Sequence, residues 1–377
     1  MRIAILTLPL HTNYGGILQA YALQTVLQRM GHEVTLLDKD RDIRKSLFRQ
    51  TLSYGKYLLK RYLLQEEVAF ITPKRQNAER KIREQHTQHF IHSHIATYRI
   101  KRLEEVEMDD FDAVVVGSDQ VWRHQYFTGL YDSPISNAYL KFCQKSHIRR
   151  IAYAASFGTD EWEYSARETE ECARLLQQFD SISVREESAI GLCERKLHRA
   201  DARLVLDPTL LLDKEDYIAL VQQAGTKRSP GNLMCYILDN NDEKQGLINR
   251  VAHERGLTPF NASSKVEDPY ATLEESIQPP VEAWLQAFVD AEFVITDSFH
   301  ACVFSIIFGK PFVVVGNRER GLSRFTSLLE MFGVTGNMLH AATDYDSHSS
   351  YGIPKTAVEL YQRAKQQSLE FLSNAFR

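Results

Sequence analysis

One histidine occupies a position from which a side chain can transfer protons to a bound ligand. His300 follows an apolar run at 293–295 and the helix-start sequence Thr-Asp-Ser at 296–298, and apolar residues continue from it to Gly309 and Pro311. This order predicts a buried parallel strand, then a helix whose first turn carries the imidazole. Open α/β folds bind ligands at that edge of the sheet. An imidazole there moves protons near neutral pH, and the helix N–H groups favour an anion.

The alternative is a structural histidine inside an apolar helix. We favour the functional interpretation because His300 lies in the first helical turn, and because further anion-binding signals recur at the same sheet edge. No second histidine, glutamate or cysteine stands at ligand spacing beside it, so we expect no metal site.

Two adjacent glycines precede the first expected helix. The loop contains Asn13, Gly15 and Gly16, and glycines in this position let the backbone approach a ligand closely. Together with Ser298 at the start of the later helix, these residues are candidates for binding an anion through backbone N–H groups. The loop has neither the Walker A sequence nor GxGxxG, so a nucleotide site is not supported, and a tight turn remains an equal alternative.

A second buried strand, ending at Val116, leads into Gly-Ser-Asp. Asp119 could orient a sugar hydroxyl or a neighbouring cationic side chain, and it could equally cap a helix. Trp122 could stack on a sugar ring, although a lone tryptophan more often fills the core.

Arginines follow two other expected strands. Arg185 comes at the end of one strand, where a guanidinium can hold a carboxylate or phosphate through two parallel hydrogen bonds. A surface ion pair with a following glutamate is the alternative. Arg318, Arg320 and Arg324 follow the strand after His300. Together these signals predict an anion-binding cleft between two domains.

The composition is that of a soluble globular protein with two domains. The chain has 377 residues, of which 44% are hydrophobic and 25% charged, and its net charge of −4 gives no sign of nucleic-acid binding. The five cysteines are scattered, which favours a reducing compartment without disulfides. The short apolar start lacks a cleavage signal, and no stretch has transmembrane length, so we expect a cytoplasmic protein.

Strands and helices alternate along the chain, which predicts an α/β fold of two Rossmann-like domains with parallel sheets. We expect an N-terminal domain at 1–212, a C-terminal domain at 213–355 and a last helix at 356–377 that packs back across the junction. The expected strands are at residues 2–8, 33–38, 111–116, 150–155, 181–184 and 204–206, then at 232–238, 258–260, 293–296 and 312–315; the expected helices are at 15–30, 243–254, 281–290, 300–308 and 356–376.

Residues 41–66 differ in character, because basic side chains are interleaved with leucines and aromatics. A basic amphipathic helix of this kind can lie on an anionic membrane surface. The alternative is an inserted helix packed on its own domain.

The ordered set of motifs resembles the polysaccharide pyruvyl transferase family. The matching parts run from near the N-terminus to about residue 335 and are each short; they are Asn13–Gln19, Val116–Trp122, Val184–Ser188, Asp207–Thr209 and Thr296–Pro311. The resemblance implies a fold like that of the two-domain GT-B glycosyltransferases, with the site in the cleft between the domains. It implies transfer of a pyruvyl group from phosphoenolpyruvate to two hydroxyls of a sugar in a surface polysaccharide precursor. A cyclic ketal forms and phosphate leaves, without a metal, nucleotide or other cofactor.

The resemblance also assigns roles. His300 matches the family's proposed general acid, and Arg185 matches an arginine thought to hold the donor. Beyond the resemblance, the residues themselves lead us to expect that Asn13, Gly15, Gly16 and Ser298 add N–H groups on the donor side, and that Asp119 and Trp122 face the acceptor. Many members have Arg-Leu-His where this chain has Ser-Phe-His at 298–300. Either Arg320 or Arg324 replaces the missing arginine, or this branch uses a different donor or acceptor.

Two other functions remain open at this point: a GT-B glycosyltransferase that uses a nucleotide sugar, and a non-catalytic sugar-binding protein of polysaccharide assembly. The acceptor is expected to be a sugar or a lipid-linked oligosaccharide. The sequence does not specify the sugar, its linkage positions or the oligomeric state.

Overall fold

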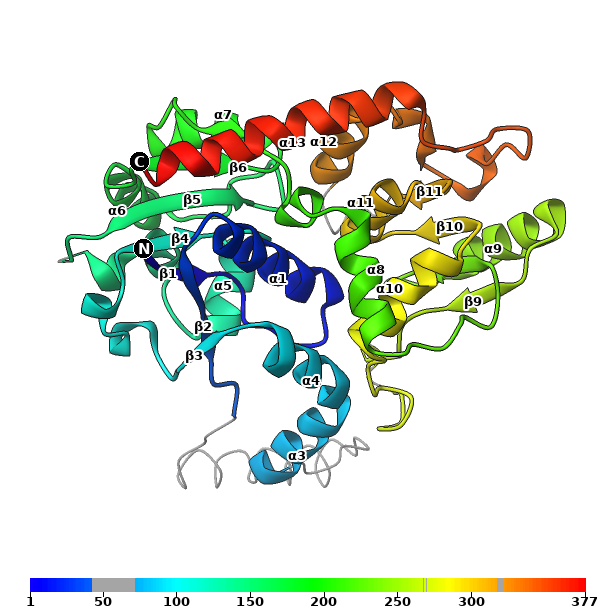
Figure 1. Cartoon of the computed structure of the whole chain (residues 1–377), viewed down its shortest axis with the longest axis horizontal. Coiled ribbons are helices and arrows are strands. Elements are labelled where there is room, and N and C mark those ends of the chain that lie inside the picture. The colour runs from blue at the N-terminus through cyan, green and yellow to red at the C-terminus, as the bar shows by residue number, and fades with distance from the viewer. Residues whose placement is uncertain (43–71, 145, 267, 269, 317–321) are drawn as a thin grey trace, which may run out of the picture.

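The computed structural model describes residues 1–42, 72–144, 146–266, 268, 270–316 and 322–377. They form two α/β domains, each built on one parallel sheet (Figure 1). The predicted fold class is therefore confirmed.

The first sheet has seven strands in the order β3-β2-β1-β4-β5-β6-β7, all parallel. Its order reverses between β1 and β4, as in the dinucleotide-binding fold. Its elements are β1 (Arg2–Leu6), α1 (Tyr14–Arg29), β2 (Glu33–Lys39), α3 (Pro73–Arg83), α4 (Gln85–His94), β3 (Thr97–Ile100), β4 (Ala113–Val116), α5 (His124–Tyr131), β5 (Arg149–Ala155), α6 (Ala166–Leu176), β6 (Ser181–Val184), α7 (Glu187–Leu197) and β7 (Arg203–Leu204).

The second sheet has five parallel strands in the order β12-β11-β10-β8-β9, and its order reverses between β8 and β10. This is the flavodoxin-like variant of the doubly wound fold. Its elements are α8 (Lys214–Gln223), β8 (Leu233–Tyr236), α9 (Asp242–Arg255), β9 (Pro259–Asn261), α10 (Val281–Asp290), β10 (Phe293–Thr296), α11 (Phe299–Phe308), β11 (Phe312–Val315), α12 (Ser323–Met331), β12 (Met338–Leu339) and α13 (Lys355–Ala375).

The central strands are uniformly apolar because helices bury both of their faces. All four residues of β4, β8, β10 and β11 are buried, and such runs are readily recognised in the sequence. β3 and β12 lie at sheet edges and were not predicted. β3 has only one buried residue of four, and β12 has two residues.

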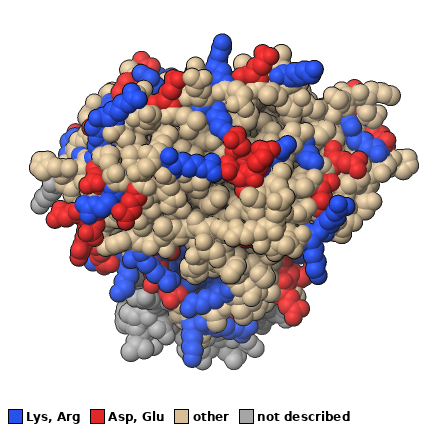
Figure 2. All heavy atoms as spheres, in the orientation of Figure 1, with Lys and Arg blue, Asp and Glu red and all other residues tan. Residues whose placement is uncertain are grey.

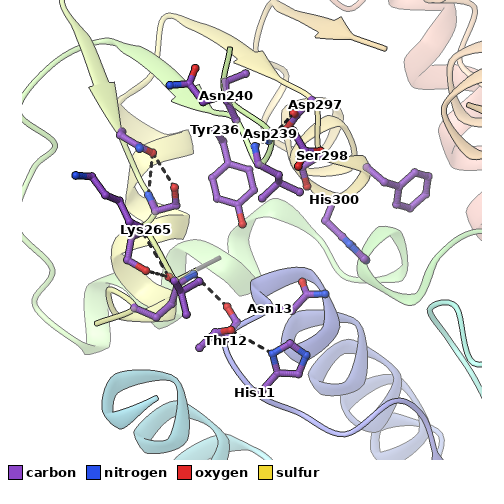
Figure 3. Close-up of a pocket in the computed structure, with 18 of the residues that line it drawn as sticks. His11, Thr12, Asn13, Tyr236, Asp239, Asn240, Lys265, Asp297, Ser298 and His300 are labelled. Carbon is purple, nitrogen blue, oxygen red and sulfur yellow. Dashed lines mark hydrogen bonds between the residues drawn. The ribbon is translucent and has the colours of Figure 1, made fainter. Parts of the chain in front are cut away.

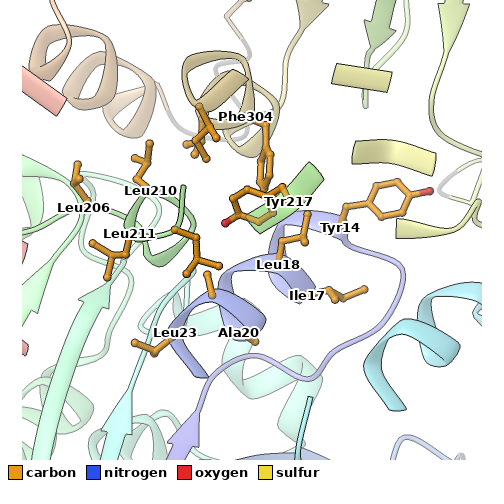
Figure 4. Packing of buried hydrophobic residues seen from close by; sticks show 14 of the residues in the cluster. Tyr14, Ile17, Leu18, Ala20, Leu23, Leu206, Leu210, Leu211, Tyr217 and Phe304 are labelled. Carbon is orange, nitrogen blue, oxygen red and sulfur yellow. The ribbon is translucent and has the colours of Figure 1, made fainter. Parts of the chain in front are cut away.

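One apolar cluster continues through the domain junction (Figure 4). Leu18 of α1 belongs to the same cluster as Leu210, which lies in a 3₁₀ turn at Pro208–Leu211 between the domains. From the other side, the Tyr217 ring of α8 meets Phe304 of α11 edge-to-face, with 4.9 Å between ring centroids. Burial of this apolar surface favours contact between the domains by about 25 cal/mol for each Å² removed from water.

The last helix, α13, crosses this junction (Figure 1). The Ser368 hydroxyl accepts the Leu206 N–H at 3.0 Å, so the chain leaves the first sheet earlier than the expected strand end at residue 206. At the far end of α13, Arg149 of β5 donates to the Ala375 carbonyl at 2.9 Å.

The opposite edge of the junction is closed by hydrogen bonds from the segment before α10. Gln278 N donates to the Arg83 carbonyl at 2.9 Å, and Arg83 Nε donates to Ser276 Oγ at 3.1 Å. The Tyr14 hydroxyl donates to the Pro279 carbonyl at 2.8 Å. These contacts join α1 and α3 of the first domain to the second domain.

The amphipathic segment predicted at 41–66 lies outside the described residues, apart from Arg41 and Asp42. Among the helices that the structure describes, none is long and apolar enough to cross a membrane. Figure 2 shows side chains of both signs over most of the face in view, with lysines and arginines gathered at its lower end, where Figure 1 places α3. Contact with a membrane surface stays a prediction.

Candidate active site

A pocket of about 590 Å³ lies between the two domains. Its walls are the loops that follow β1, β4, β8 and β10, together with the loop after β9 and the start of α12. β1 and β4 flank the reversal point of the first sheet, and β8 and β10 flank that of the second. The pocket therefore occupies the position at which open α/β sheets bind ligands, in both domains at once.

His300 lines this pocket from the first turn of α11 (Figure 3). Within the described residues its Nε2 has no hydrogen-bond partner, although the residue is only 7% exposed. Nε2 lies 3.7 Å from Asp207 Oδ2, which is longer than a hydrogen bond but is an ion-pair distance when the ring is protonated. A buried polar atom without a partner is uncommon, so this nitrogen is suited to meet a ligand.

The ring of His300 packs directly against the start of α1. A Cβ added to Gly15 would lie 2.0 Å from His300 Nδ1, so only glycine allows this approach. Gly15 was predicted to bind the donor through its backbone. In the structure it is buried and supports the imidazole from behind.

Arg185 does not line the pocket. Its side chain is 1% exposed and donates to Asp207 at 2.8 Å and to Asp119 at 3.0 Å, with Glu186 at 3.9 Å. A guanidinium surrounded by three carboxylates is already neutralised. We therefore correct the assignment of Arg185 as a donor-binding residue: it holds the carboxylates that face His300.

Asp207 is the anionic partner of His300 and belongs to the first domain. Ser118 Oγ donates to it at 3.2 Å and Thr209 Oγ1 at 2.7 Å. Burial alone would raise the pKa of the Asp207 carboxyl, but His300 and Arg185 outweigh burial and hold the pKa well below its usual value. Asp207 is therefore ionised and aligned by several donors.

Asp119 lines the pocket as predicted for a ligand contact, but one of its oxygens accepts from Arg185. Burial opposes ionisation here too, and the nearby Arg185 and His300 nevertheless lower the pKa of Asp119. Its contact with an acceptor stays a prediction.

Trp122 is not at the pocket. It is fully buried, stacks on Tyr139 with 5.1 Å between ring centroids, and donates its indole N–H to the Ala138 carbonyl at 3.3 Å. The assignment of Trp122 as an acceptor contact is corrected to a core residue, because no face of its ring reaches the solvent.

Arg324 comes from the first turn of α12 and lines the pocket while only 6% exposed. Its guanidinium carbon lies 5.5 Å from the centre of the Phe299 ring, and that of Arg185 lies 4.7 Å from the same ring. Burial, followed by repulsion from Arg185, lowers the pKa of Arg324 to about 10. Arg324 thus brings positive charge to the pocket beside His300. Arg318 and Arg320 lie outside the described residues.

The helices α1 and α11 both present their N-termini to the pocket, and of these two, within the described residues, α1 is the one with a side-chain cap. Asn13 accepts the Gly16 N–H at 3.2 Å, so one predicted anion-binding N–H is already engaged. Ser298 makes no capping hydrogen bond to the part of α11 that the structure describes. The first N–H groups of α11 therefore remain available to an anion.

Asp297 fixes the loop on the other side of His300. Its carboxylate accepts the N–H groups of Leu238 and Asp239 at 2.7 and 3.0 Å, and the buried Lys244 ammonium at 2.7 Å. This arrangement ties the end of β10 to the loop after β8, so hydrogen bonds connect two walls of the pocket.

Sequence reasoning did not assign several residues of the pocket. Most follow β8 and β9, which were both predicted as strands, so the rule that placed His300 at a sheet edge could also have found them. The unassigned residues include His11, Tyr236, Asn240, Asn261, Ser263 and Lys265. Asp207 was noted only as part of a motif.

The residues that the structure describes contain no group of three or more His, Cys, Asp or Glu side chains placed to hold a metal ion. All five cysteines are buried and unpaired.

A family model for polysaccharide pyruvyl transferase matches residues 13–319. No curated protein matches the sequence significantly. Among solved structures, the UDP-GlcNAc 2-epimerase of Neisseria meningitidis bound to UDP-GlcNAc is 10% identical, with a TM-score of 0.45 over 100% of this chain and 94% of its own.

Two further structures are similar to the same degree. The sucrose-phosphate synthase of Thermosynechococcus elongatus is 12% identical, with a TM-score of 0.46 over 100% of this chain and 98% of its own. A glycosyltransferase of Rickettsia africae ESF-5 is 9% identical, with a TM-score of 0.43 over 100% and 93%. At these identities the likeness concerns chain architecture and carries no statement about substrates.

Proposed function

The chain belongs to the polysaccharide pyruvyl transferase family, and on that basis we propose that it moves the pyruvyl group of phosphoenolpyruvate onto two hydroxyls of a sugar. The acceptor would be a sugar of a surface polysaccharide precursor, free or lipid-linked. The product would be a cyclic ketal, and phosphate would leave.

The observation that carries this proposal is the unpartnered Nε2 of His300 at the pocket wall, with Asp207 3.7 Å away. Pyruvyl transfer needs an acid that protonates the methylene carbon of the enol, C3. That step leaves an oxocarbenium-like centre at C2, which one sugar hydroxyl attacks. A second hydroxyl then displaces phosphate from C2. General acid catalysis of this kind is worth roughly 10²–10⁴-fold in rate.

The donor carries a carboxylate and a phosphate, and the pocket offers positive charge for them beside His300. The N-terminus of α11, which has no side-chain cap within the described part of the chain, supplies N–H groups, and Arg324 supplies a guanidinium. Arg324 packs on Phe299, one residue from Ser298, where many members of the family carry an arginine. We propose that Arg324 takes over the contact with the donor that this arginine makes.

The other end of the pocket suits a sugar. Its lining includes amide and hydroxyl side chains, which hydrogen-bond to sugar hydroxyls, together with the carboxylates of Asp239 and Asp268. The amide and hydroxyl side chains are those of Asn240, Asn261, Ser263, Ser264 and Gln278. The Lys265 ammonium at this end is already paired with Glu275.

The test is release of phosphate from phosphoenolpyruvate, measured against a panel of galactosyl, mannosyl and N-acetylhexosaminyl acceptors. Release that depends on one acceptor, together with a product heavier by one pyruvyl ketal, is the expected result. Thermal stabilisation by phosphoenolpyruvate should accompany it. Stabilisation by a nucleoside diphosphate instead, with no phosphate release, would replace this proposal with a nucleotide-sugar glycosyltransferase. Saturable donor binding without release from any acceptor would indicate a non-catalytic protein.

A further inference from the structure

The pocket contains a second imidazole, which comes from the first domain. His11 lies in the loop between β1 and α1 and lines the same pocket as His300. Figure 3 draws both rings at the pocket wall, with Asn13 at the start of α1 between their labels. Each domain thus contributes one imidazole to the pocket.

One side of the His11 ring is anchored. Its Nδ1 lies 3.1 Å from Thr12 Oγ1, and the Thr12 carbonyl accepts a hydrogen bond from Gln278 Nε2 at 3.1 Å. Among the residues that the structure describes, Thr12 is the one hydrogen-bond partner of the ring. The anchor fixes the ring in the loop and leaves Nε2 available to a ligand in the pocket.

The two imidazoles lie in different electrostatic surroundings. His11 is half-buried; burial, and then the nearby Arg41 guanidinium, lower the pKa of His11 to about 4, against an opposing effect of Asp119. The His11 ring is therefore neutral near pH 7. Beside His300, in contrast, stand the carboxylates of Asp207 and Asp119. Enzymes divide the acid and base roles between two titratable groups by placing them in contrasting environments of this kind.

We propose that His11 is the general base that removes the proton from the sugar hydroxyl attacking C2, while His300 acts as the acid. The inference rests on the proposed function and adds a residue to it. In a neutral imidazole one ring nitrogen is an acceptor, and a group so placed can take a hydroxyl proton within hydrogen-bond reach.

The protons balance over one turnover. The protonated His300 gives its proton to C3, and His11 takes one from the first hydroxyl as its oxygen bonds to C2. In the second half, His300 takes a proton from the second hydroxyl as that oxygen bonds to C2. The bond from C2 to the phosphate oxygen breaks, and the protonated His11 gives its proton to the departing phosphate. Both histidines return to their starting forms, with one hydroxyl proton on the methyl group and one on phosphate.

The variant His11→Gln tests this role, with His86→Gln as the matched control, because His86 is exposed on α4 and lies outside the pocket. In His11→Gln we expect turnover to fall roughly 10²–10⁴-fold, while the dissociation constant for phosphoenolpyruvate stays unchanged. A base must be deprotonated to act, so turnover of the wild type falls as pH drops towards the pKa of His11. His11→Gln should lack that acidic limb in its residual activity. Wild-type turnover in His11→Gln overturns the role of His11 and leaves the proposed function intact.

A second measurement does not depend on the variant's folding. Diethyl pyrocarbonate modifies neutral imidazoles that it can reach, so we expect it to modify His11 of the wild-type protein, with the exposed His86 as the control for reagent activity. Phosphate release should be lost in step with this modification, and the acceptor should prevent both. An unmodified His11 beside a modified His86 overturns the proposal. A wild-type protein that releases no phosphate with any acceptor contradicts the proposed function itself, and so differs from either of these results.

Discussion

The helices α1 and α11 both begin at the pocket, one from each domain, and their first turns are built differently. In α1, Asn13 caps the helix and Gly15 supplies a surface without a side chain. In α11, Ser298 provides no cap within the described residues, and His300 stands in the first turn. The two helix starts meet where the His300 ring packs on Gly15.

The start of α1 supports the His300 ring, whereas the start of α11 carries it. The N-terminus of α1 is satisfied by its own asparagine and serves as a wall for the imidazole. The N-terminus of α11 keeps N–H groups without such a cap and carries the group that can transfer a proton. A strand followed by a helix start occurs at both places in the sequence. At α1 the helix start supports a neighbouring side chain, and at α11 it carries the proposed catalytic histidine.

The largest expected effect comes from removing the imidazole at α11. His300→Gln keeps a side chain of similar length, but its amide does not titrate near neutral pH and cannot act as the acid. Turnover should fall roughly 10²–10⁴-fold, with the melting temperature nearly unchanged. Steady-state phosphate release and a thermal melt measure the two quantities, and the exposed His348→Gln is the control. Normal turnover in His300→Gln would remove His300 from the mechanism.

The second effect concerns the carboxylate that the first domain presents to α11. Asp207→Asn takes away one partner of the buried Arg185, which should cost about 3 kcal/mol in the free energy of unfolding. Because the pKa of Asp207 is lowered in the folded protein, its charge stabilises the fold above the unfolded pKa, and this contribution is lost as pH falls below it. Urea denaturation at pH 7, 5, 4 and 3 should therefore show a shallower loss of stability in Asp207→Asn than in the wild type. If stability fell equally with pH in both proteins, protonation of Asp207 would not contribute to the pH dependence of stability.

Gly15→Ala tests the contact between the two helix starts. The new methyl group would overlap the His300 ring, so the ring or the helix must shift, at a cost of about 1–3 kcal/mol in stability and with a loss of turnover. Gly246→Ala, in the middle of α9, is the matched control. Among the described residues, none lies within 4 Å of its added Cβ, so the control should be stabilised by roughly 0.5–1 kcal/mol. Equal melting temperatures for the two variants would show that the two helix starts can shift to accommodate the methyl group without loss of stability.

The smallest effect compares the two caps directly. Asn13→Ala should lower the free energy of unfolding by about 0.5–2 kcal/mol, because the Gly16 N–H loses its acceptor. Ser298→Ala removes no capping bond and should stay within roughly 0.5 kcal/mol of the wild type. Chemical denaturation of both variants measures the two changes in the free energy of unfolding. A larger loss in Ser298→Ala would reverse the contrast between α1 and α11.

Much of the architecture could be predicted from the sequence because its central strands are continuous apolar runs. The strands at 181–184, 293–296 and 312–315 have the predicted bounds, and the helix at 281–290 does too. The edge strand β3 escaped prediction because the half-exposed Tyr98 and the exposed Arg99 leave little pattern. Its place was set by pairing with β2, which is a tertiary effect.

The site could be predicted only in part. His300 and Arg324 were placed at the correct sheet edge because strand ends converge there, and the structure puts both at the pocket. Arg185 also follows a strand, yet its charge is neutralised by Asp119 and Asp207, which come from distant parts of the chain. A single sequence does not reveal such pairings. For the same reason the sequence does not show that Trp122 packs on Tyr139 in the core.

The arrangement of the junction also decides how the two domains can separate. Both chain crossings, at residues 205–213 and at α13, run along one edge, where Tyr361 of α13 donates to the Leu210 carbonyl at 2.8 Å. At the other edge the domains are joined by hydrogen bonds from Arg83, Gln278 and Tyr14. Separation at the first edge is therefore limited by the covalent chain and by α13, whereas separation at the second edge requires only that these hydrogen bonds break.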